Sequence, residues 1–341
     1  MSPRRDLDED DVRVRPGKGS RPRTRQRPDH ADAVPALVTT VDRGRYTCLV
    51  DDRVVLAVRA RELGRHGRVV VGDRVALQGD LDGGNDNLAR IVRVEPRSSV
   101  LRRSADDSDP VERVLVANAD QLVIVTAVTQ PEPRPRLIDR CLVAALDAGL
   151  DPLLCLTKTD LAPPDALLDS YRALDVPYVT WRRVSSTDPI LEKLHDRVSV
   201  LVGHSGVGKS TLVNALVPEA ARTTGEVNAV TGRGRHTSSS AVALPLPDGG
   251  WVVDTPGVRS FGLAHVSPAD LLRAFPDLQA ASLACPPGCD HSGSDPLCAL
   301  DHSEVDPARR DSFRRLLAAR VGADDYSVTS RQTSTEPPDR Q

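Results

Sequence analysis

Apolar and polar residues alternate with a period of two in the early part of the chain. Between residues 34 and 97, turns containing Gly, Asp and Asn separate five such runs: ALVTTV, YTCLVD, VVLAVRA, DRVALQGD and ARIVRVE. Five short strands at this spacing predict a small β-barrel, and an OB-like or an SH3-like arrangement fits the pattern equally well. Tyr46 is the single aromatic residue of this region. The barrel therefore lacks a stacking platform for single-stranded bases, and any contact with RNA would join arginine to phosphate.

The periodicity changes beyond a polar stretch at residues 98–113. Apolar runs that predict strands occur at 122–128, 153–157, 178–184, 198–202 and 251–254. Stretches with helical periodicity, such as 136–149 and 209–217, lie between several of them. Strands that alternate with helices predict an α/β domain with a doubly wound, mostly parallel sheet.

These patterns divide the chain into five regions. Residues 13–27 hold seven basic residues and no acidic one, so the N-terminal region is either a solubilising tail or an arm that contacts RNA. We expect a disordered basic arm at 1–33, an OB-like barrel at 34–97, the α/β domain at 98–262 with a linker at 98–113, a helical segment with clustered cysteines at 263–322, and a disordered tail at 323–341.

Composition narrows the class of protein. A hydrophobic content of 39% and a charged content of 27% are typical of soluble globular proteins, and the net charge of -3 gives no overall attraction to nucleic acid. No apolar run approaches the roughly 20 residues of a bilayer span, and the N-terminus lacks the apolar stretch of a signal peptide. We therefore expect a cytoplasmic protein with no membrane partner.

The stretch GHSGVGKST at 203–211 matches the phosphate-binding loop, or P-loop, because it follows a predicted strand and opens a predicted helix. Its glycines let backbone N–H groups converge on phosphates, the Lys209 ammonium neutralises the β and γ oxygens, and the Ser210 hydroxyl is a ligand for Mg²⁺. The predicted nucleotide contacts of this loop are Gly203, His204, Ser205, Gly206, Val207, Gly208, Lys209, Ser210 and Thr211.

The stretch DTPG at 254–257 follows the predicted strand WVVD. Alone it could be a simple Pro-Gly turn. Together with an upstream P-loop it predicts that Asp254 holds Mg²⁺ through water and that the Gly257 N–H meets the γ-phosphate.

The stretch TKTD at 157–160 is suited to reading guanine. The Asp160 carboxylate can accept hydrogen bonds from guanine N1–H and the 2-amino group, whereas adenine would leave it unpaired. The Lys158 stem can lie along the base. A second short loop, after the strand that ends at Val184, can complete the base pocket. The predicted base contacts are Thr157, Lys158, Thr159, Asp160, Ser185 and Ser186.

The base loop precedes the P-loop, which is the reverse of the usual GTPase order. All these loops leave the carboxyl ends of parallel strands, where ligands of such sheets bind. Joining the original termini and cutting elsewhere changes which strand comes first without moving any loop. The sequence therefore predicts a circularly permuted P-loop GTPase.

Four soft ligands, Cys285, Cys289, His291 and Cys298, lie within fourteen residues. This set predicts one structural Zn²⁺ site with no open position for water, and free thiols in a loop are the alternative. His302 could replace His291 as a ligand. The other cysteines, Cys48, Cys141 and Cys155, are expected to be buried thiols. The stretch 306–320 predicts a helix with an Asp N-cap and a basic face, which either contacts rRNA phosphates or is simply solvated.

The order of the regions and the stretches QPEPRPRLIDRCLVAA, GHSGVGKSTLVNAL, GRGRHTSS and DTPGVRSFGL resemble the ribosome small-subunit-dependent GTPase family RsgA over residues 34–322. The resemblance implies a GTPase that uses GTP and GDP with Mg²⁺ and carries an OB-like barrel and a zinc segment. It also implies that the protein binds the small ribosomal subunit and its rRNA late in maturation, is stimulated by the subunit and helps release assembly factors. We expect a monomer.

The resemblance also assigns catalytic roles beside that of Lys209. Val258 stands where many GTPases have the glutamine that orients the attacking water, and valine cannot hydrogen-bond. By resemblance, His236 orients the water and Thr237 reaches Mg²⁺, with Ser238 as a possible substitute. The family has Asn in place of Thr157, so this chain is expected to lose an amide that ties the base loop to the P-loop. We therefore expect weaker nucleotide binding without loss of selectivity. The zinc spacing also departs from the family, with one residue fewer between the first two cysteines and one more between His291 and Cys298.

Two other classes of function fit the sequence. One is an RNA-binding assembly scaffold that uses GTP only as a binding switch. The other is a P-loop ATPase or kinase in which TKTD occurs by chance.

Overall fold

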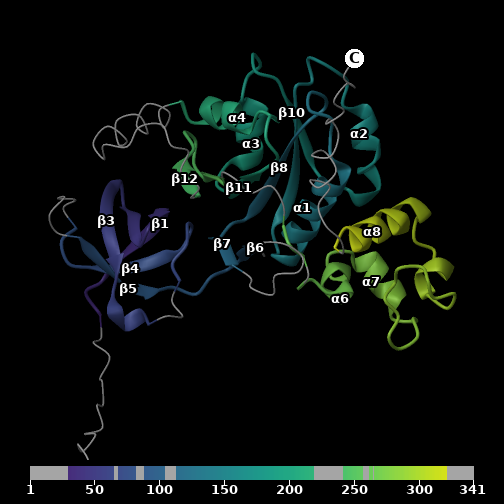
Figure 1. Ribbon diagram of the computed structural model, residues 1–341, viewed down its shortest axis with the longest axis horizontal. Coiled ribbons are helices and arrows are strands. Elements are labelled where there is room, and N and C mark those ends of the chain that lie inside the picture. Colours follow the sequence, from purple (N-terminus) through teal and green to yellow (C-terminus); the bar gives the residue numbers. More distant parts are fainter. Residues whose placement is uncertain are drawn as a thin grey trace, which may run out of the picture. The chain divides into compact units, whose positions relative to one another are not determined.

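The computed structural model describes residues 30–64, 68–81, 88–103, 113–218, 241–255, 261–263 and 265–320 (Figure 1). The chain divides into two units, Met1–Asp32 and Ala33–Gln341, and every described helix and strand belongs to the second. None of the described helices is long and apolar enough to cross a membrane.

The first five strands form a closed barrel. They are β1 (Val34–Asp42), β2 (Arg45–Val50), β3 (Arg53–Arg59), β4 (Arg74–Gln78) and β5 (Ala89–Val94). The pairing order is β1-β2-β3-β5-β4, and β4 pairs again with β1. β5 pairs parallel with β3 and antiparallel with β4, so it lies between them. This five-stranded Greek-key order is that of the OB-fold and excludes a simple meander. A short 3₁₀ helix, Arg61–Leu63, follows β3.

A doubly wound sheet forms the second part. The strands β8 (Gln121–Ala127), β9 (Asp151–Thr157), β10 (Tyr178–Trp181), β11 (Val198–Val202) and β13 (Trp251–Asp254) are parallel and lie in the order β10-β9-β8-β11-β13. Leu122 and Ile124 of β8 belong to the core on one face of this sheet, and Val123 and Val125 belong to the core on the other. Both faces are therefore covered, as the near-continuous apolar strands predict.

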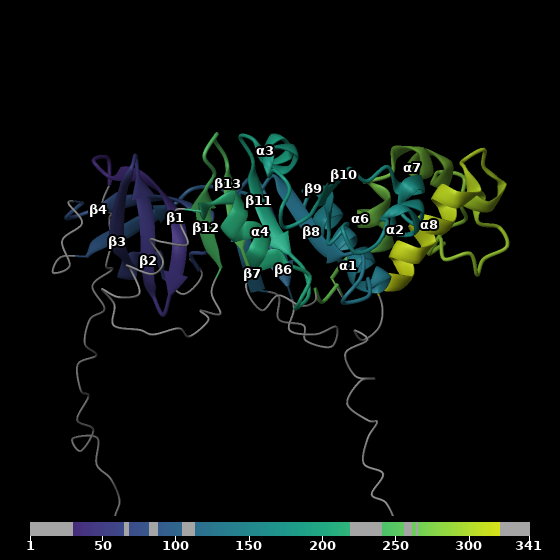
Figure 2. The same cartoon turned by 90° about the horizontal axis from the view of Figure 1, so that it is seen from above.

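Helices pack on each face of the sheet (Figure 2). The residues of α3 (Asp188–Leu194) and α4 (Lys209–Leu216) share one core with Val123. α1 (Pro135–Asp147) and the 3₁₀ turn η3 (Arg172–Leu174) share the other core with Leu122. The short α2 (Asp165–Asp169) precedes η3. The predicted α/β class is confirmed.

Three short strands were not predicted. β6 (Val100–Arg103) and β7 (Arg113–Ala117) form a two-stranded sheet, so part of the expected linker at 98–113 is a strand. β12 (Val242–Pro245) pairs antiparallel with β13 and also with the barrel strand β1, at Thr40 and Val242. β6 carries two arginines in a polar stretch, and β12 ends at a proline. Both features weigh against a strand, unlike the apolar run of the equally short β13.

The C-terminal part consists of α6 (Pro268–Leu272), α7 (Pro276–Ser282), the 3₁₀ turn η4 (Ala299–His302) and α8 (Pro307–Ala319). α8 begins as its sequence predicts: the Asp306 carboxylate accepts a hydrogen bond from the Ala308 N–H at 2.9 Å, and Pro307 is the first helical residue. Phe313 of α8 meets Phe275 edge-to-face at 5.5 Å and belongs to the same core as α1.

The basic face of α8 is turned toward the protein. Its four central arginines have side chains no more than 36% exposed. Their carboxylate partners are Asp175 and Asp277 for Arg309, Asp301 for Arg310 and Arg314, and Asp139 for Arg315. Because these guanidiniums are paired with carboxylates of the protein, α8 is not a simple solvated face. Contact of this helix with rRNA phosphates stays a prediction.

Buried Arg140 of α1 ties α8 to the segment after DTPG. It donates hydrogen bonds to the Ala319 carbonyl, at 2.8 Å, and to the Phe261 carbonyl. Its side chain is almost fully buried. A buried guanidinium that satisfies two backbone carbonyls fixes the end of α8 against the sheet domain.

Candidate nucleotide and metal sites

The P-loop lies between β11 and α4, at the carboxyl end of a central strand. A Cβ at Gly203 would lie 2.4 Å from the Val125 carbonyl oxygen, so only glycine allows this close approach. Gly208, at the N-cap of α4, has a φ of 94°, a conformation that favours glycine. Val207 is fully buried beneath the loop, whereas Ser205, Ser210 and Thr211 are exposed. The loop and the positive end of α4 form a geometry suited to phosphate.

Lys209 forms an ion pair with Asp254. The register Leu201–Asp254 of the β11–β13 pair brings this carboxylate next to the P-loop. Thr255 follows, and its hydroxyl donates a hydrogen bond to the Leu201 carbonyl at 2.7 Å. The sequence alone does not indicate this role of Thr255, because the role depends on a neighbouring strand. The predicted phosphate-binding ammonium and the predicted magnesium-binding carboxylate are therefore adjacent.

The base loop is tied to the P-loop by two side chains. The buried Thr157 hydroxyl donates a hydrogen bond to the Val207 carbonyl at 2.5 Å, and the Lys158 ammonium donates to the Gly206 carbonyl at 2.9 Å and to the Gln130 carbonyl. The expectation that threonine at 157 loses the link between these loops is therefore wrong: the hydroxyl, although shorter than an asparagine amide, reaches the backbone of the P-loop directly. Asp160 is exposed two residues further on.

Replacing Thr157 with valine should test this link. Valine keeps the shape but leaves the buried Val207 carbonyl without this donor, at a cost of about 1–3 kcal/mol. We expect GTP affinity to fall about 10-fold, measured by titration with a fluorescent GTP analogue, while guanine selectivity is unchanged. Thr157→Ser retains the hydroxyl and is the control. Equal affinity of the valine and serine variants would show that the hydrogen bond is unimportant.

His204 is a buried residue of the P-loop. It is 5% exposed, and its Nδ1–H donates to the Ser205 carbonyl at 3.0 Å. Burial lowers the pKa of His204, and the nearby cations Arg134 and Lys158 lower it further, although the contact with Ser205 opposes them. The imidazole is therefore neutral and supports the loop through the Ser205 carbonyl.

Ser185 and Ser186 follow β10, which pairs with β9 so that Trp181 lies beside Thr157. The Ser185 hydroxyl donates to the Arg182 carbonyl at 2.8 Å, and the Ser186 hydroxyl accepts from the Asp188 N–H at 3.0 Å. Both hydroxyls thus form hydrogen bonds with the backbone of the loop that carries them, and this loop lies next to the base loop.

Several predicted residues lie outside the described residues. They are Gly257, His236 and Thr237, together with Ser238 and Val258. Among the predicted site residues that the structure describes, those of the base loop, the P-loop and Asp254 converge at the carboxyl edge of the parallel sheet.

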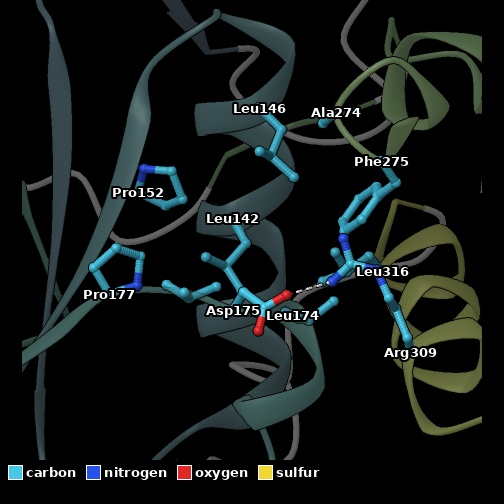
Figure 3. A pocket seen from close by; sticks show the side chains of 11 residues that line it. Leu142, Leu146, Pro152, Leu174, Asp175, Pro177, Ala274, Phe275, Arg309 and Leu316 are labelled. Atoms are coloured by element: carbon cyan, nitrogen blue, oxygen red, sulfur yellow. Dashed lines mark hydrogen bonds and ion pairs between the residues drawn. The ribbon is translucent and has the colours of Figure 1, made fainter. Parts of the chain in front are cut away.

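A cavity of about 180 Å³ lies elsewhere, between α1, the loop before β10 and the C-terminal helices (Figure 3). It is lined mainly by apolar side chains, including Leu142, Leu146 and Phe275, with the Arg309–Asp175 ion pair at 2.9 Å beside it. It contains no predicted site residue and reflects incomplete packing between α1 and α8.

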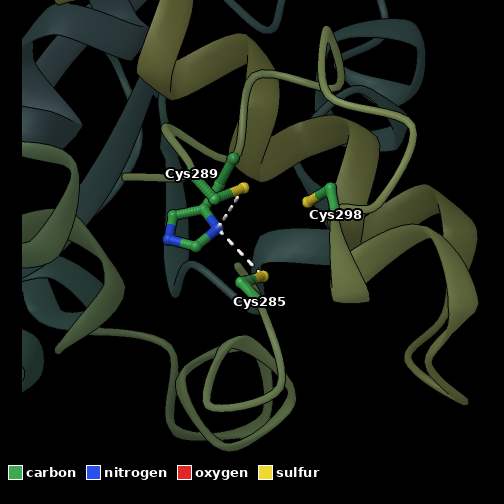
Figure 4. A group of neighbouring side chains, drawn as sticks. Cys285, Cys289 and Cys298 are labelled. Carbon is green, nitrogen blue, oxygen red and sulfur yellow. Dashed lines mark hydrogen bonds between the residues drawn. The ribbon is translucent and has the colours of Figure 1, made fainter. Parts of the chain in front are cut away.

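The four predicted zinc ligands come together (Figure 4). Their ligand atoms all lie within 4.8 Å of one another. His291 Nδ1 lies 3.5 Å from Cys285 Sγ and 3.6 Å from Cys289 Sγ. Tetrahedral zinc with ordinary bond lengths places a sulfur and a nitrogen ligand about 3.6 Å apart. The residues therefore fit zinc. His302 is not part of the group, and its Nε2 contacts the Pro296 carbonyl at 3.1 Å.

The protonation behaviour of this cluster follows from its surroundings. Burial raises the pKa of Cys289 to about 11 and lowers that of His291. Away from the cluster, Cys48, Cys141 and Cys155 are buried as expected, and burial raises the pKa of Cys48 and of Cys155 to about 12. Among the described residues, the group that could hold a metal ion is the C-terminal one.

Comparison with known proteins gives the family. The family model described as RsgA GTPase matches residues 94–264. The chain belongs to the RsgA GTPase family. The "Small ribosomal subunit biogenesis GTPase RsgA" of Pseudomonas aeruginosa (strain PAO1) is 39% identical over 263 residues, covering 74% of this chain and 76% of that protein. The protein of the same name from Pseudomonas putida (strain KT2440) is 38% identical over 270 residues, covering 76% of each chain. As a member of this family, the chain is a GTP hydrolase.

Solved structures show the same fold. YjeQ from Thermotoga maritima matches with a TM-score of 0.64 and 24% identity, over 85% of this chain and 99% of that chain. YloQ, described as a circularly permuted GTPase, matches with a TM-score of 0.60 and 24% identity, over 86% and 96%. The permuted GTPase fold predicted from the loop order is confirmed.

Proposed function

We propose that this RsgA-family chain hydrolyses GTP to GDP and phosphate in late maturation of the small ribosomal subunit, in the cytoplasm, and that the subunit stimulates its turnover. The observation that carries the proposal is the convergence of the base loop, the P-loop and Asp254 at one edge of the sheet. The names of the relatives support the ribosomal role.

Each described side chain has a role in this proposal. Asp160 reads guanine, while Thr157 and Lys158 hold the base loop against the P-loop. Lys209 contacts the β and γ oxygens. The Ser210 hydroxyl would be a ligand of Mg²⁺, and the Asp254 carboxylate would hold the ion through water, since Mg²⁺ prefers hard oxygen ligands. When bound, Mg²⁺ offsets the negative charge that develops on the phosphates. His236 and Thr237 are proposed to complete the site, His236 by orienting the attacking water.

The C-terminal cysteines and His291 are proposed to hold one structural Zn²⁺. A closed Cys₃His set leaves no position for a reacting water, so the metal stabilises the loop rather than taking part in chemistry. The barrel, the zinc segment and the N-terminal arm are the proposed contacts with the subunit, its rRNA and assembly factors, and the protein is proposed to act as a monomer.

Hydrolysis of GTP and of ATP by the purified protein, with and without isolated small ribosomal subunits, tests the proposal. We expect selective turnover of GTP that rises at least 10-fold with subunits. Large ribosomal subunits provide the control. Binding of GTP without turnover, even with small subunits, would favour a scaffold that uses GTP as a switch, and turnover of ATP would contradict the role of the base loop.

A further inference from the structure

Arg314 of α8 reaches the proposed zinc site from outside the ligand set. Its Nη2 lies 3.8 Å from Cys298 Sγ, and its Nε donates a hydrogen bond to the His291 carbonyl at 3.1 Å. One side chain thus contacts two of the four ligand residues. Cys298 is fully buried, so its sulfur has few other sources of polar contact.

The guanidinium is held in place by Asp301. The two groups form a bidentate pair, with Nη1–Oδ1 at 2.7 Å and Nη2–Oδ2 at 2.8 Å. This fork fixes the plane of the guanidinium, which a lysine ammonium could not do.

The loop between His291 and Cys298 is shaped to receive this side chain. A Cβ at Gly293 would lie 2.9 Å from the Arg314 Cζ. The guanidinium therefore lies flat against a stretch of backbone without a side chain.

The positive charge of Arg314 favours metal binding by the sulfur that it contacts. Zinc with three thiolates and a neutral imidazole carries a net charge of about -1. N–H donors to the sulfurs offset that charge and hold the thiolates in their binding positions. The Ala299 N–H lies 3.3 Å from Cys285 Sγ, and Arg314 supplies the corresponding contact to Cys298.

We propose that Arg314 is a positioning residue that retains the metal by holding the Cys298 thiolate and the His291 turn in their binding geometry. This inference rests on the proposed zinc site. It also makes α8 the element that joins the metal loop to the sheet domain, because the neighbouring Arg315 pairs with Asp139 of α1.

Metal transfer from the full-length protein tests the proposal. Wild type and Arg314→Met, each loaded with one equivalent of Zn²⁺, are mixed with a chromophoric chelator, and the rate and extent of transfer are recorded. We expect Arg314→Met to bind zinc 10- to 100-fold more weakly, as is typical when an outer partner of a ligand is removed. Arg314→Lys, which keeps the charge but not the fork, should lie between the two. With Co²⁺ in place of zinc, the sulfur-to-metal charge-transfer band should shift in Arg314→Met, because the sulfur loses an N–H donor.

Arg310→Met is the matched control. Arg310 lies on the same helix, 3.6 Å from the same Asp301, and it contacts no ligand residue among the interactions described. Its metal affinity should stay within twofold of wild type. An affinity and a cobalt spectrum of Arg314→Met equal to those of this control would overturn the proposal.

Two further comparisons separate the possible failures. If Arg314→Met does not fold, Asp301→Asn and Arg314→Lys test the inference instead. Each weakens the bidentate pair without removing a long side chain. Unchanged metal retention in both variants would refute the inference. A wild-type protein that takes up no stoichiometric zinc would refute the metal site itself, whereas wild-type zinc binding with an unaltered Arg314→Met would refute only the role of Arg314.

Discussion

Asp160→Asn is expected to change the base preference from guanine to xanthine. The Asp160 carboxylate is proposed to accept hydrogen bonds from guanine N1–H and the 2-amino group. An asparagine amide still accepts from N1–H, but its NH₂ then faces the 2-amino group, donor against donor. Xanthine has an oxygen at this position and matches the amide. Loss of a charge-assisted bond and an unpaired donor together cost about 2.5–6 kcal/mol, so GTP affinity should fall roughly 10²- to 10⁴-fold.

The measurement is competition of GTP, XTP and ATP for a fluorescent guanine nucleotide or its xanthine counterpart, followed by turnover of each. Asp165→Asn removes the same charge from an exposed position at the start of α2 and should leave the preference for GTP unchanged. Retention of GTP preference by Asp160→Asn would mean that TKTD does not read the base. Because Thr157 and Lys158 bind the P-loop through their own side chains, the variant loop should remain in place.

The sequence was sufficient to predict those features that depend on local order. The P-loop, the N-cap of α8 and the metal cluster each consist of residues close in sequence, and each has a chemical requirement that few residue types satisfy. The circular permutation was also predictable, because the order of motifs is itself a property of the sequence. β6 and β12 were missed because the first carries two arginines in a polar stretch and the second ends at a proline.

Features that depend on distant partners were not predictable in the same way. The arginines of α8 form a basic stripe in the sequence, but their partners Asp139 and Asp175 precede them by more than a hundred residues. Threonine at 157 was expected to lose the link that asparagine would make between the two loops. Nothing in the sequence shows that the Val207 carbonyl lies 2.5 Å from the Thr157 hydroxyl. In both cases a side chain was judged by its type, whereas its role depends on which backbone or carboxylate the fold brings to it.

His236→Ala is expected to abolish the stimulation of GTP hydrolysis by the small subunit while leaving GTP affinity within twofold of wild type. Val258 has no hydrogen-bonding side chain at the place of the usual water-orienting glutamine. Positioning the water must therefore fall to another group, and His236 lies in the segment between α4 and β12, where a loop that closes over the γ-phosphate belongs. Losing a group that acts in proton transfer or water orientation lowers turnover by about 10²- to 10⁴-fold.

The stimulated rate separates a catalytic role from a structural one. His195→Ala is the control, because His195 is exposed in the same domain, at the end of α3, and pairs only weakly with Asp196. Single-turnover hydrolysis should be measured with saturating subunits, together with GTP binding and co-sedimentation with the subunits. A loss of turnover with binding intact would place His236 in the chemical step, since a loop required only for docking would lose co-sedimentation as well. Unchanged stimulated turnover would assign water orientation to another residue.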